Sequence, residues 1–167
     1  RLADYARTNH IEEQFDLIEL GANTGQLACD ILDSLRSDFP HLYKKVRYTI
    51  CEPLASMHKI QSSTLKEHSA IVEFHATLSD IKQAKKHGIL LSNELIDAFP
   101  VKLITKKDGQ WRELHVVNDN DDFTFITEAI HSPQLQEFCN NLPPLPDGYT
   151  TEYRPGLEAF AQKCASV

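Results

Sequence analysis

The stretch Phe15-Asp-Leu-Ile-Glu-Leu-Gly-Ala-Asn-Thr-Gly25 decides the fold of this chain. Its first six residues are mostly apolar, which is typical of a buried strand. Gly21 lets the backbone turn sharply out of that strand, and Gly25 lets the start of the next helix approach a ligand closely. Apolar residues then recur with helical spacing as far as Leu35. This order of strand, glycine turn and helix indicates an α/β protein that binds a nucleotide-like ligand at the end of its first strand.

The acid at Glu19, two residues before the first glycine, indicates the charge of that ligand. A carboxylate at this place would repel a pyrophosphate, and the Gly-x-Gly-x-x-Gly pattern of NAD-binding loops is absent from the sequence. S-adenosylmethionine (SAM) carries a sulfonium and an ammonium group, and a nearby carboxylate favours both. Its amino-acid carboxylate can bind the free N–H groups at the start of the helix. We therefore expect a SAM-binding loop built from Glu19, Gly21, Asn23 and Gly25, with an NAD-dependent dehydrogenase as a weaker alternative.

Strands and helices alternate through the first hundred residues. The predicted strands cover residues 15–20, 46–51, 71–74 and 88–92. The predicted helices between them cover residues 25–35, 56–66 and 78–86. This alternation favours an α/β fold with a doubly wound, mostly parallel, Rossmann-like sheet that has helices on both faces. The apolar strand over residues 88–92 is expected in the centre of the sheet.

The pattern changes after Pro100. Strands at residues 101–105 and 111–117 flank a Lys-Lys-Asp-Gly turn and predict a β-hairpin insertion. A further strand (residues 123–127), a helix (131–140), an extended segment (149–153) and a last helix (156–164) follow. We expect a single SAM-binding domain over residues 1–167. A doubly wound sheet usually continues past four strands, so we also expect the chain to be a fragment of a longer protein.

Acids at the ends of two later strands complete the predicted site. Glu52 ends the second strand, where a carboxylate can accept both hydroxyls of a ribose; the alternative is a surface acid. Asn93, Glu94 and Asp97 follow the fourth strand, at the edge where ligands collect in open α/β sheets. There they would face the methyl group that SAM transfers, although Asp97 could instead cap a short helix.

The composition narrows the partners. The formal net charge is −7 and the chain has no basic stripe, which argues against nucleic acid and suits a basic protein or a cationic small molecule. No apolar run is long enough for a membrane span. The four cysteines are widely spaced without a Cys-x-x-Cys pair, which is typical of free thiols in a reducing compartment such as the cytoplasm. The eight histidines are scattered, so we predict no metal site.

Three blocks of the sequence resemble the MidA family of SAM-dependent methyltransferases. They are Ile18-Glu-Leu-Gly-Ala-x-x-Gly-x-Leu-Ala-x-Asp-Ile-Leu32, Tyr48-Thr-Ile-Cys-Glu-Pro53 and Gly88-Ile-Leu-Leu-Ser-Asn-Glu-Leu-Ile-Asp-Ala-Phe-Pro-Val101, with a weaker fourth at Gly148-Tyr-Thr-Thr-Glu152. The resemblance implies a Rossmann-like methyltransferase fold that continues beyond both ends of this chain. A mitochondrial member of the family methylates an arginine on a respiratory complex I subunit. The resemblance therefore implies a protein arginine as substrate, and the mitochondrial matrix as an alternative location.

By position, the resemblance places Gly21, Asn23 and Gly25 in the SAM loop, Glu52 on the ribose, and the family block of Asn93, Glu94 and Asp97 beside the reaction centre. One departure is Asn23, where the family usually has glycine; asparagine tolerates a left-handed backbone better than most residues. For an arginine acceptor, Glu94 is the first choice to clamp the guanidinium, and Asp97 the second. Asn23 also leaves open a different class of protein, a non-catalytic SAM-binding assembly factor or scaffold.

Overall fold

The computed structural model describes residues 2–8, 13–81 and 88–166. The chain divides into two compact units: unit 1 comprises Arg1–Asp97 with Ala159–Val167, and unit 2 comprises Ala98–Glu158. The two units subdivide the stretch over which a single domain is predicted, residues 1–167, and that single domain stays a prediction. Within the described residues, no helix has the length and apolar character needed to cross a membrane.

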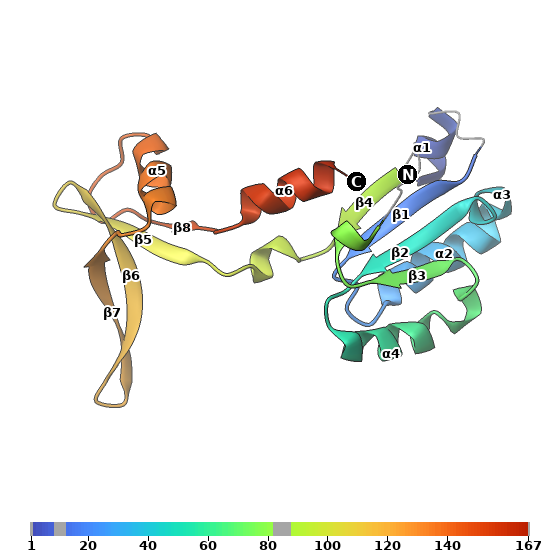
Figure 1. Ribbon diagram of the computed structural model, residues 1–167, viewed down its shortest axis with the longest axis horizontal. Helices are drawn as coiled ribbons and strands as arrows, with labels where there is room; N and C mark the ends of the chain where they lie inside the picture. Colours follow the sequence, from blue (N-terminus) through green and yellow to red (C-terminus); the bar gives the residue numbers. More distant parts are fainter. Residues whose placement is uncertain (1, 9–12, 82–87, 167) are drawn as a thin grey trace. The chain divides into compact units, whose positions relative to one another are not determined.

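Unit 1 is built around a parallel sheet, labelled in Figure 1. Its strands are β1 (Phe15–Leu20), β2 (Val46–Cys51), β3 (Val72–His75) and β4 (Gly88–Ser92). Its helices are α1 (Leu2–Thr8), α2 (Gln26–Asp38), α3 (Pro40–Tyr43) and α4 (Ala55–Thr64), with the 3-10 turns η1 (Lys66–His68), η2 (Leu78–Asp80) and η3 (Ile96–Ala98), the last of which runs into unit 2. The last helix of the chain, α6 (Leu157–Ala165), lies mostly in unit 1.

The order of the strands creates a reversal point beside β1. Among the described residues the order is β3-β2-β1-β4, so β1 pairs in parallel with β2 on one side and with β4 on the other. The chain therefore moves outward from β1 through β2 to β3 and then returns to the opposite side for β4. In open α/β sheets, ligands bind at such a point, outside the carboxyl ends of the strands.

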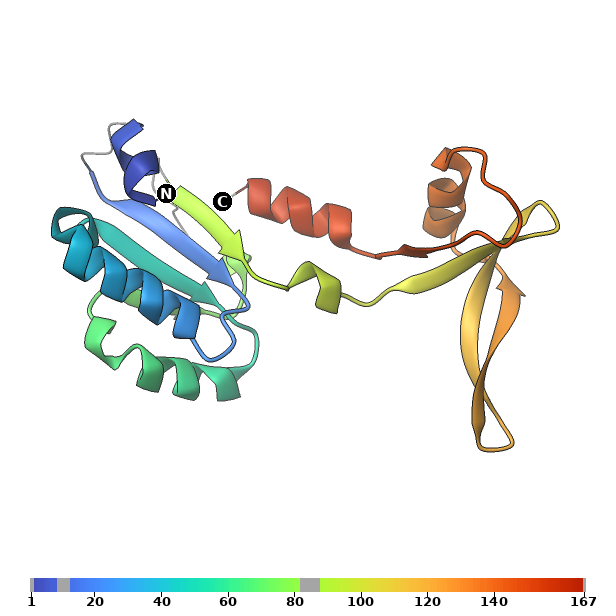
Figure 2. The same cartoon turned by 180° about the vertical axis from the view of Figure 1, so that it is seen from behind.

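Alternating residues of β1 pack against the two faces of the sheet. Phe15 and Leu17 belong to a core that includes residues of α1, α2, α3 and the start of η1, and α2 and α4 lie on the same face of the sheet in both views (Figures 1 and 2). Ile18 and Leu20 point to the other face and form a smaller cluster that includes Phe160 of α6. Helices thus cover both faces of this sheet, and a mixed α/β fold is confirmed. The finer Rossmann-like description stays a prediction.

Local patterns predicted most elements of unit 1 correctly, but two expectations need correction. Strand β4 lies at the edge of the described sheet instead of its centre, and its residues are half-buried or exposed. The apolar residues of β4 pack against both faces of the sheet, with Ile89 in one cluster and Leu90 in the other. Such a pattern indicates burial on both faces but not the number of strands beside β4. The helix predicted over residues 78–86 is a short 3-10 turn over Leu78–Asp80, and residues 82–87 lie outside the described part of the chain.

Unit 2 is an antiparallel sheet with one helix. Its described strands, in the order β7-β6-β5-β8, are β5 (Lys102–Lys107), β6 (Gln110–Asp119), β7 (Asp122–Ala129) and β8 (Thr150–Tyr153), and its helix is α5 (Pro133–Asn141). The predicted hairpin is the pair β5 and β6, and two further strands extend it into a sheet. A small core of Ile104, Leu135 and Cys139 joins this sheet to α5.

Candidate functional site

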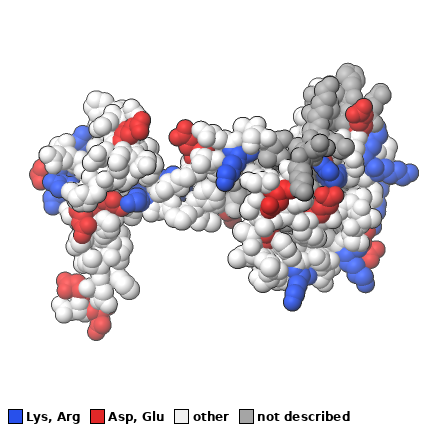
Figure 3. Space-filling view, viewed as in Figure 1, with Lys and Arg blue, Asp and Glu red and all other residues white. Residues whose placement is uncertain are grey.

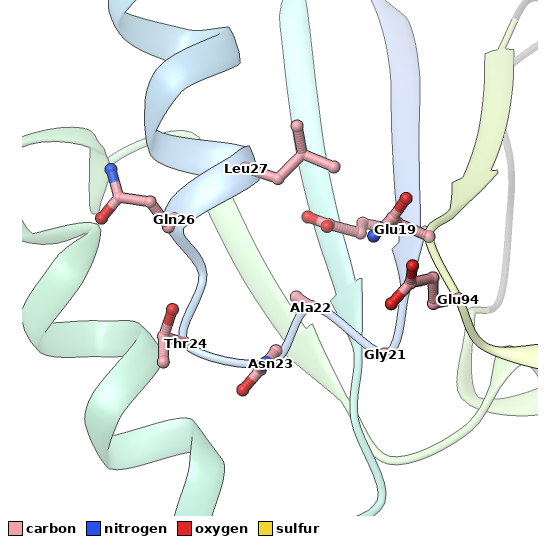
Figure 4. A pocket seen from close by; sticks show the side chains of 9 residues that line it. Glu19, Gly21, Ala22, Asn23, Thr24, Gln26, Leu27 and Glu94 are labelled. Atoms are coloured by element: carbon pink, nitrogen blue, oxygen red, sulfur yellow. The ribbon is translucent and has the colours of Figure 1, made fainter. Parts of the chain in front are cut away.

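A pocket of about 330 Å³ lies in unit 1, at the point where the strand order reverses. One wall is the end of β1 with the loop into α2, and the other is the segment after β4. The lining residues are Glu19, Gly21, Ala22, Asn23, Thr24, Gln26, Leu27, Asn93 and Glu94. Figure 4 shows Glu19 at the end of β1 and Glu94 on the segment that follows β4. The volume is in the range of small-molecule sites.

Glu19 is the buried acid of this pocket. Its residue is only 2% exposed, and the Tyr48 hydroxyl of β2 donates a hydrogen bond of 2.8 Å to its Oε2. Burial raises the pKa of Glu19, and the bond from Tyr48 offsets part of that increase. Burial, together with the neighbouring carboxylate, also raises the pKa of Tyr48. A buried carboxylate whose hydrogen bond comes from a neutral donor is costly to keep charged, and a cationic ligand in the pocket would relieve that cost.

The loop between β1 and α2 takes the conformation for which the glycines were expected. Gly21, Asn23 and Gly25 have φ values of 69°, 48° and 81°, all in the left-handed region. At Gly21 a side chain would also collide, because an added Cβ would lie 2.9 Å from Leu95 Cδ1. Asn23 occupies its left-handed position, and its carbonyl accepts a 2.9 Å hydrogen bond from Nε2 of the buried Gln61. The asparagine is therefore compatible with the shape of the loop.

The start of α2 supplies donors for an anionic group. Gly25 is the N-cap residue and gives no side-chain hydrogen bond to the first turn, so the backbone N–H groups there are not capped in this way. Gly25 itself is not among the lining residues. An added Cβ on it would lie 3.4 Å from Leu65 Cδ1 and 3.5 Å from Gln61 Cα, so Gly25 allows α2 to start close to α4. Gly25 thus shapes the loop from behind.

The block after β4 divides into residues inside and outside the pocket. Asn93 and Glu94 line it, and Glu94 has a φ of 48°, which is uncommon for a residue other than glycine. Leu95 packs in the core cluster of Ile18 and Leu20 and against Gly21. Asp97 is exposed in η3 and is not a lining residue. The structure therefore brings two of the three predicted catalytic residues to the pocket.

Glu52 lies next to the pocket, at the end of β2. The residue is 7% exposed, and its Oε1 accepts a 3.1 Å hydrogen bond from the backbone N–H of Leu54. The preceding residue, Cys51, accepts a 3.1 Å backbone hydrogen bond from Gly21, which joins the ends of β1 and β2. Glu52 is not among the lining residues, so its predicted contact with a ribose stays a prediction.

The two buried residues that hydrogen-bond to the residues lining the pocket were not identified from the sequence. Tyr48 and Gln61 are buried residues of β2 and α4, and each touches the site because two segments distant in the sequence pack together. Only the strand register, which pairs Leu17 with Tyr48 and so puts Tyr48 on the same face as Glu19, could have revealed the first contact. The other missed lining residues are Ala22, Thr24, Gln26 and Leu27.

The fold and the pocket together indicate the kind of ligand that this protein binds. A parallel α/β sheet with a left-handed glycine loop, a buried carboxylate and an uncapped helix start is suited to a ligand with both cationic and anionic ends. SAM has this combination in its ammonium, sulfonium and carboxylate groups, and the residues present fit it. A family model described as "Putative S-adenosyl-L-methionine-dependent methyltransferase" matches residues 2–167. The chain therefore belongs to this SAM-dependent family.

Two solved structures share the fold. One is a COG1565 superfamily member from Burkholderia thailandensis bound to S-adenosyl-homocysteine (SAH), with a TM-score of 0.73, 23% identity, and coverage of 98% of this chain and 41% of that one. The other is a native structure of a protein of the same superfamily from the same organism, with a TM-score of 0.74, 23% identity, and coverage of 98% and 42%. The chain thus spans less than half the length of these two proteins. No curated protein matches it.

Proposed function

We propose that this chain forms the cofactor-binding part of an enzyme that methylates arginine on a basic protein, as in the MidA family. One observation carries the proposal: the buried Glu19 carboxylate faces a pocket whose opposite wall holds Asn93 and Glu94. The SAM dependence of the family, and the SAH bound to a protein of the same fold, support the cofactor. The strand order around β1 supports a Rossmann-like arrangement of the complete sheet.

Each wall of the pocket would bind a different part of the cofactor. Glu19 would pair with its cationic groups, the N–H groups at the start of α2 would bind its carboxylate, and Glu52 would accept hydrogen bonds from the ribose. When bound, SAM supplies an electrophilic methyl group. The remaining work of the protein is to exclude water and to hold the acceptor in line, which lowers the barrier by several kcal/mol in oriented reactions.

Glu94 is the residue that we assign to the acceptor. A guanidinium is protonated at neutral pH and must lose a proton when its nitrogen gains a methyl group. A carboxylate can bind two N–H groups of the flat cation and accept that proton. Both acids are exposed, but Glu94 lines the pocket and Asp97 does not, so Glu94 remains the first choice and Asp97 the second.

The test uses the full-length protein. Calorimetric titration with SAH measures cofactor binding, and transfer of a labelled methyl group to an arginine-containing basic protein measures activity. We expect Glu94→Gln to lower turnover by about 100-fold or more, the usual effect of losing a general base, with SAH affinity nearly unchanged. Glu67→Gln, which alters an exposed acid on η1, is the matched control. Unaltered turnover in Glu94→Gln would reject the role.

The same measurements separate the alternative, a non-catalytic SAM-binding assembly factor. That alternative depended on Asn23 weakening the cofactor loop, and the φ of 48° at this residue shows that asparagine fits the loop. SAH binding without any methyl transfer would favour the assembly factor.

The partner and the location remain part of the proposal. Acidic and basic side chains are interspersed on the face drawn in Figure 3, and the net charge of −7 suits a basic protein such as a respiratory complex I subunit. We expect no nucleic-acid partner and no membrane contact. We place the protein in the cytoplasm, with the mitochondrial matrix as the alternative.

A further inference from the structure

Three side chains of the types that bind metal ions meet beside α2, outside the pocket described above. Cys29 and Asp33 are one helical turn apart on α2, and His68 ends η1. The Cys29 sulfur, a carboxylate oxygen of Asp33 and a ring nitrogen of His68 all lie within 4.8 Å of one another. None of the three lines the pocket. The sequence predicted no metal site because the histidine comes from a different segment, 35 residues after the aspartate.

His68 is the unusual member of this cluster. It is 1% exposed, and its Nδ1 lies 2.9 Å from the Tyr43 hydroxyl, whose ring packs edge-on against the imidazole. Among the described residues, His68 Nε2 has no hydrogen-bond partner. Asp33 Oδ1 lies 3.2 Å from it, within the distance of an ion pair but without forming a hydrogen bond. A buried nitrogen in this state is costly unless another group binds it.

We propose that Cys29, Asp33 and His68 bind a zinc ion, with water as the fourth ligand. Sulfur, imidazole and carboxylate are the three ligand types of zinc, and sites with three protein ligands and one water are common. Ligands of a tetrahedral zinc ion lie roughly 3.3–3.8 Å apart, as its bond lengths require. Cys29 Sγ lies 3.7 Å from Asp33 Oδ2 and His68 Nε2 lies 3.2 Å from the other carboxylate oxygen, Oδ1, so the exposed Asp33 carboxylate would have to rotate for one oxygen to serve as the ligand.

The surroundings of the cluster favour zinc over a bare ion pair. A thiolate and a carboxylate would neutralise the two positive charges of the ion. The Tyr43 hydroxyl can accept a hydrogen bond from Nδ1–H, which leaves Nε2 free to bind metal, as partners of zinc-bound histidines usually do.

Two features oppose binding and set its conditions. Arg36 Nη2 lies 2.6 Å from Asp33 Oδ1, and this exposed ion pair must yield to the metal. Burial, followed by the charge of Asp33, raises the pKa of the Cys29 thiol, so binding must release its proton. The ion pair predicts an affinity that increases when Arg36 is removed, and the raised thiol pKa predicts an affinity that increases with pH.

The experiment titrates Co²⁺ and Zn²⁺ into the chelator-treated full-length protein. We expect one Co²⁺ per chain, with a sulfur-to-cobalt charge-transfer band and tetrahedral visible bands that Zn²⁺ abolishes. Cys29→Ser should remove the charge-transfer band, and Asp33→Asn should weaken binding at least tenfold. Tyr43→Phe should weaken it roughly tenfold through the orientation of His68. Arg36→Gln should strengthen it.

The matched controls are Cys164→Ser, a half-buried thiol on α6, and Asp30→Asn, an acid on α2 outside the cluster. Both should bind Co²⁺ as the unaltered protein does. Because Asp33 is an exposed side chain, Asp33→Asn tests the site even if a change at the buried His68 prevents folding. The proposal is overturned if no stoichiometric Co²⁺ binds, or if Cys29→Ser and Cys164→Ser give the same spectrum.

Discussion

The two units of this chain differ in how many of their described side chains are buried. In unit 1, both faces of the parallel sheet carry clusters of buried apolar residues. In unit 2, the buried residues among those described are Ile104, Glu113, Leu135 and Cys139, and every residue of β7 is exposed. A unit with a dense core can hold a buried carboxylate in a fixed place, whereas a thinly covered sheet presents its side chains to solvent or to partners.

The acids of the two units show what this difference does. Glu113 of unit 2 is bound by Lys102 at 2.8 Å, so its charge is already compensated within the protein. Glu19 of unit 1 is buried more deeply, at 2% exposure against 8%, yet the hydrogen bond that it accepts comes from the neutral hydroxyl of Tyr48. The core of unit 1 thus holds a buried carboxylate beside a pocket, and in the function that we propose a cationic cofactor balances its charge.

The largest expected effect separates the two cores. Leu32→Ala in unit 1 and Leu135→Ala in unit 2 each truncate a leucine that is 0% exposed. Each should lower the free energy of unfolding of its own unit by about 2–5 kcal/mol, because it leaves a cavity. Only Leu32→Ala should also weaken SAH binding, since α2 begins at the loop that we propose binds the cofactor. Urea titration with calorimetry measures both quantities, and an equal loss of SAH affinity in Leu135→Ala would break the comparison.

The next effect concerns the charge of Glu19. Glu19→Gln keeps an oxygen for Tyr48 but removes the charge, and SAM should bind roughly 30-fold more weakly or worse. SAH lacks the sulfonium charge and should lose less. Competition binding with both ligands measures the difference. Equal losses for the two ligands would show that Glu19 does not pair with the sulfonium.

In the absence of ligand, the difference in stability between Glu19→Gln and the unaltered protein should depend on pH. Burial raises the pKa of Glu19 in the folded protein, so the folded state holds this proton more tightly than the unfolded chain. The carboxylate therefore costs stability as the pH increases above its ordinary value of 4.5. Glu19→Gln should become increasingly more stable than the unaltered protein over this range. Thermal unfolding at several pH values checks the sign, and a constant difference would contradict it.

A smaller effect is expected at the turn. Gly21→Ala should cost about 1–2 kcal/mol for its left-handed φ of 69°, and more for the contact 2.9 Å from Leu95 Cδ1. Adding Leu95→Ala should relieve the steric clash and regain that part of the unfolding free energy, but not the part lost to the backbone conformation. A double-mutant cycle on the unfolding free energy separates the two contributions. If the double mutant shows no recovery, the steric contact is not the reason for glycine at this position.

The smallest effect is expected on β7. Phe123 and Phe125 are 81% and 60% exposed, so neither has a core to support. Phe123→Thr and Phe125→Thr keep the β-propensity and should each change the unfolding free energy by no more than about 0.5 kcal/mol. Urea titration measures this change. A larger loss would show that β7 is covered in solution, and would weaken the contrast between the units.

Local patterns explain how much of the fold could be predicted. Strands β1, β2 and β4 begin and end where the sequence places them, because each is an apolar run bounded by turn residues. Asn23 was expected to tolerate a left-handed backbone, and it does. The edge position of β4 was not predictable, since a run of apolar residues does not say which strands lie beside it.

The site shows the same limit. Glu19, Asn93 and Glu94 were predicted from their places at strand ends, and they meet because the carboxyl ends of parallel strands share one edge of the sheet. Asp97 belongs to the same sequence block, yet η3 leaves it exposed. The support from Tyr48 depends on the register between β1 and β2, which is a long-range property.

The sequence by itself determined the strands, the glycine loop and the residues that carry charge at the sheet edge, because backbone propensity and apolar periodicity act over a few neighbouring residues. The tertiary structure decided which of those charges are buried, which tyrosine supports Glu19, and that His68 lies beside Cys29 and Asp33. Burial and long-range pairing depend on how distant segments pack, and packing is a property of the whole folded unit.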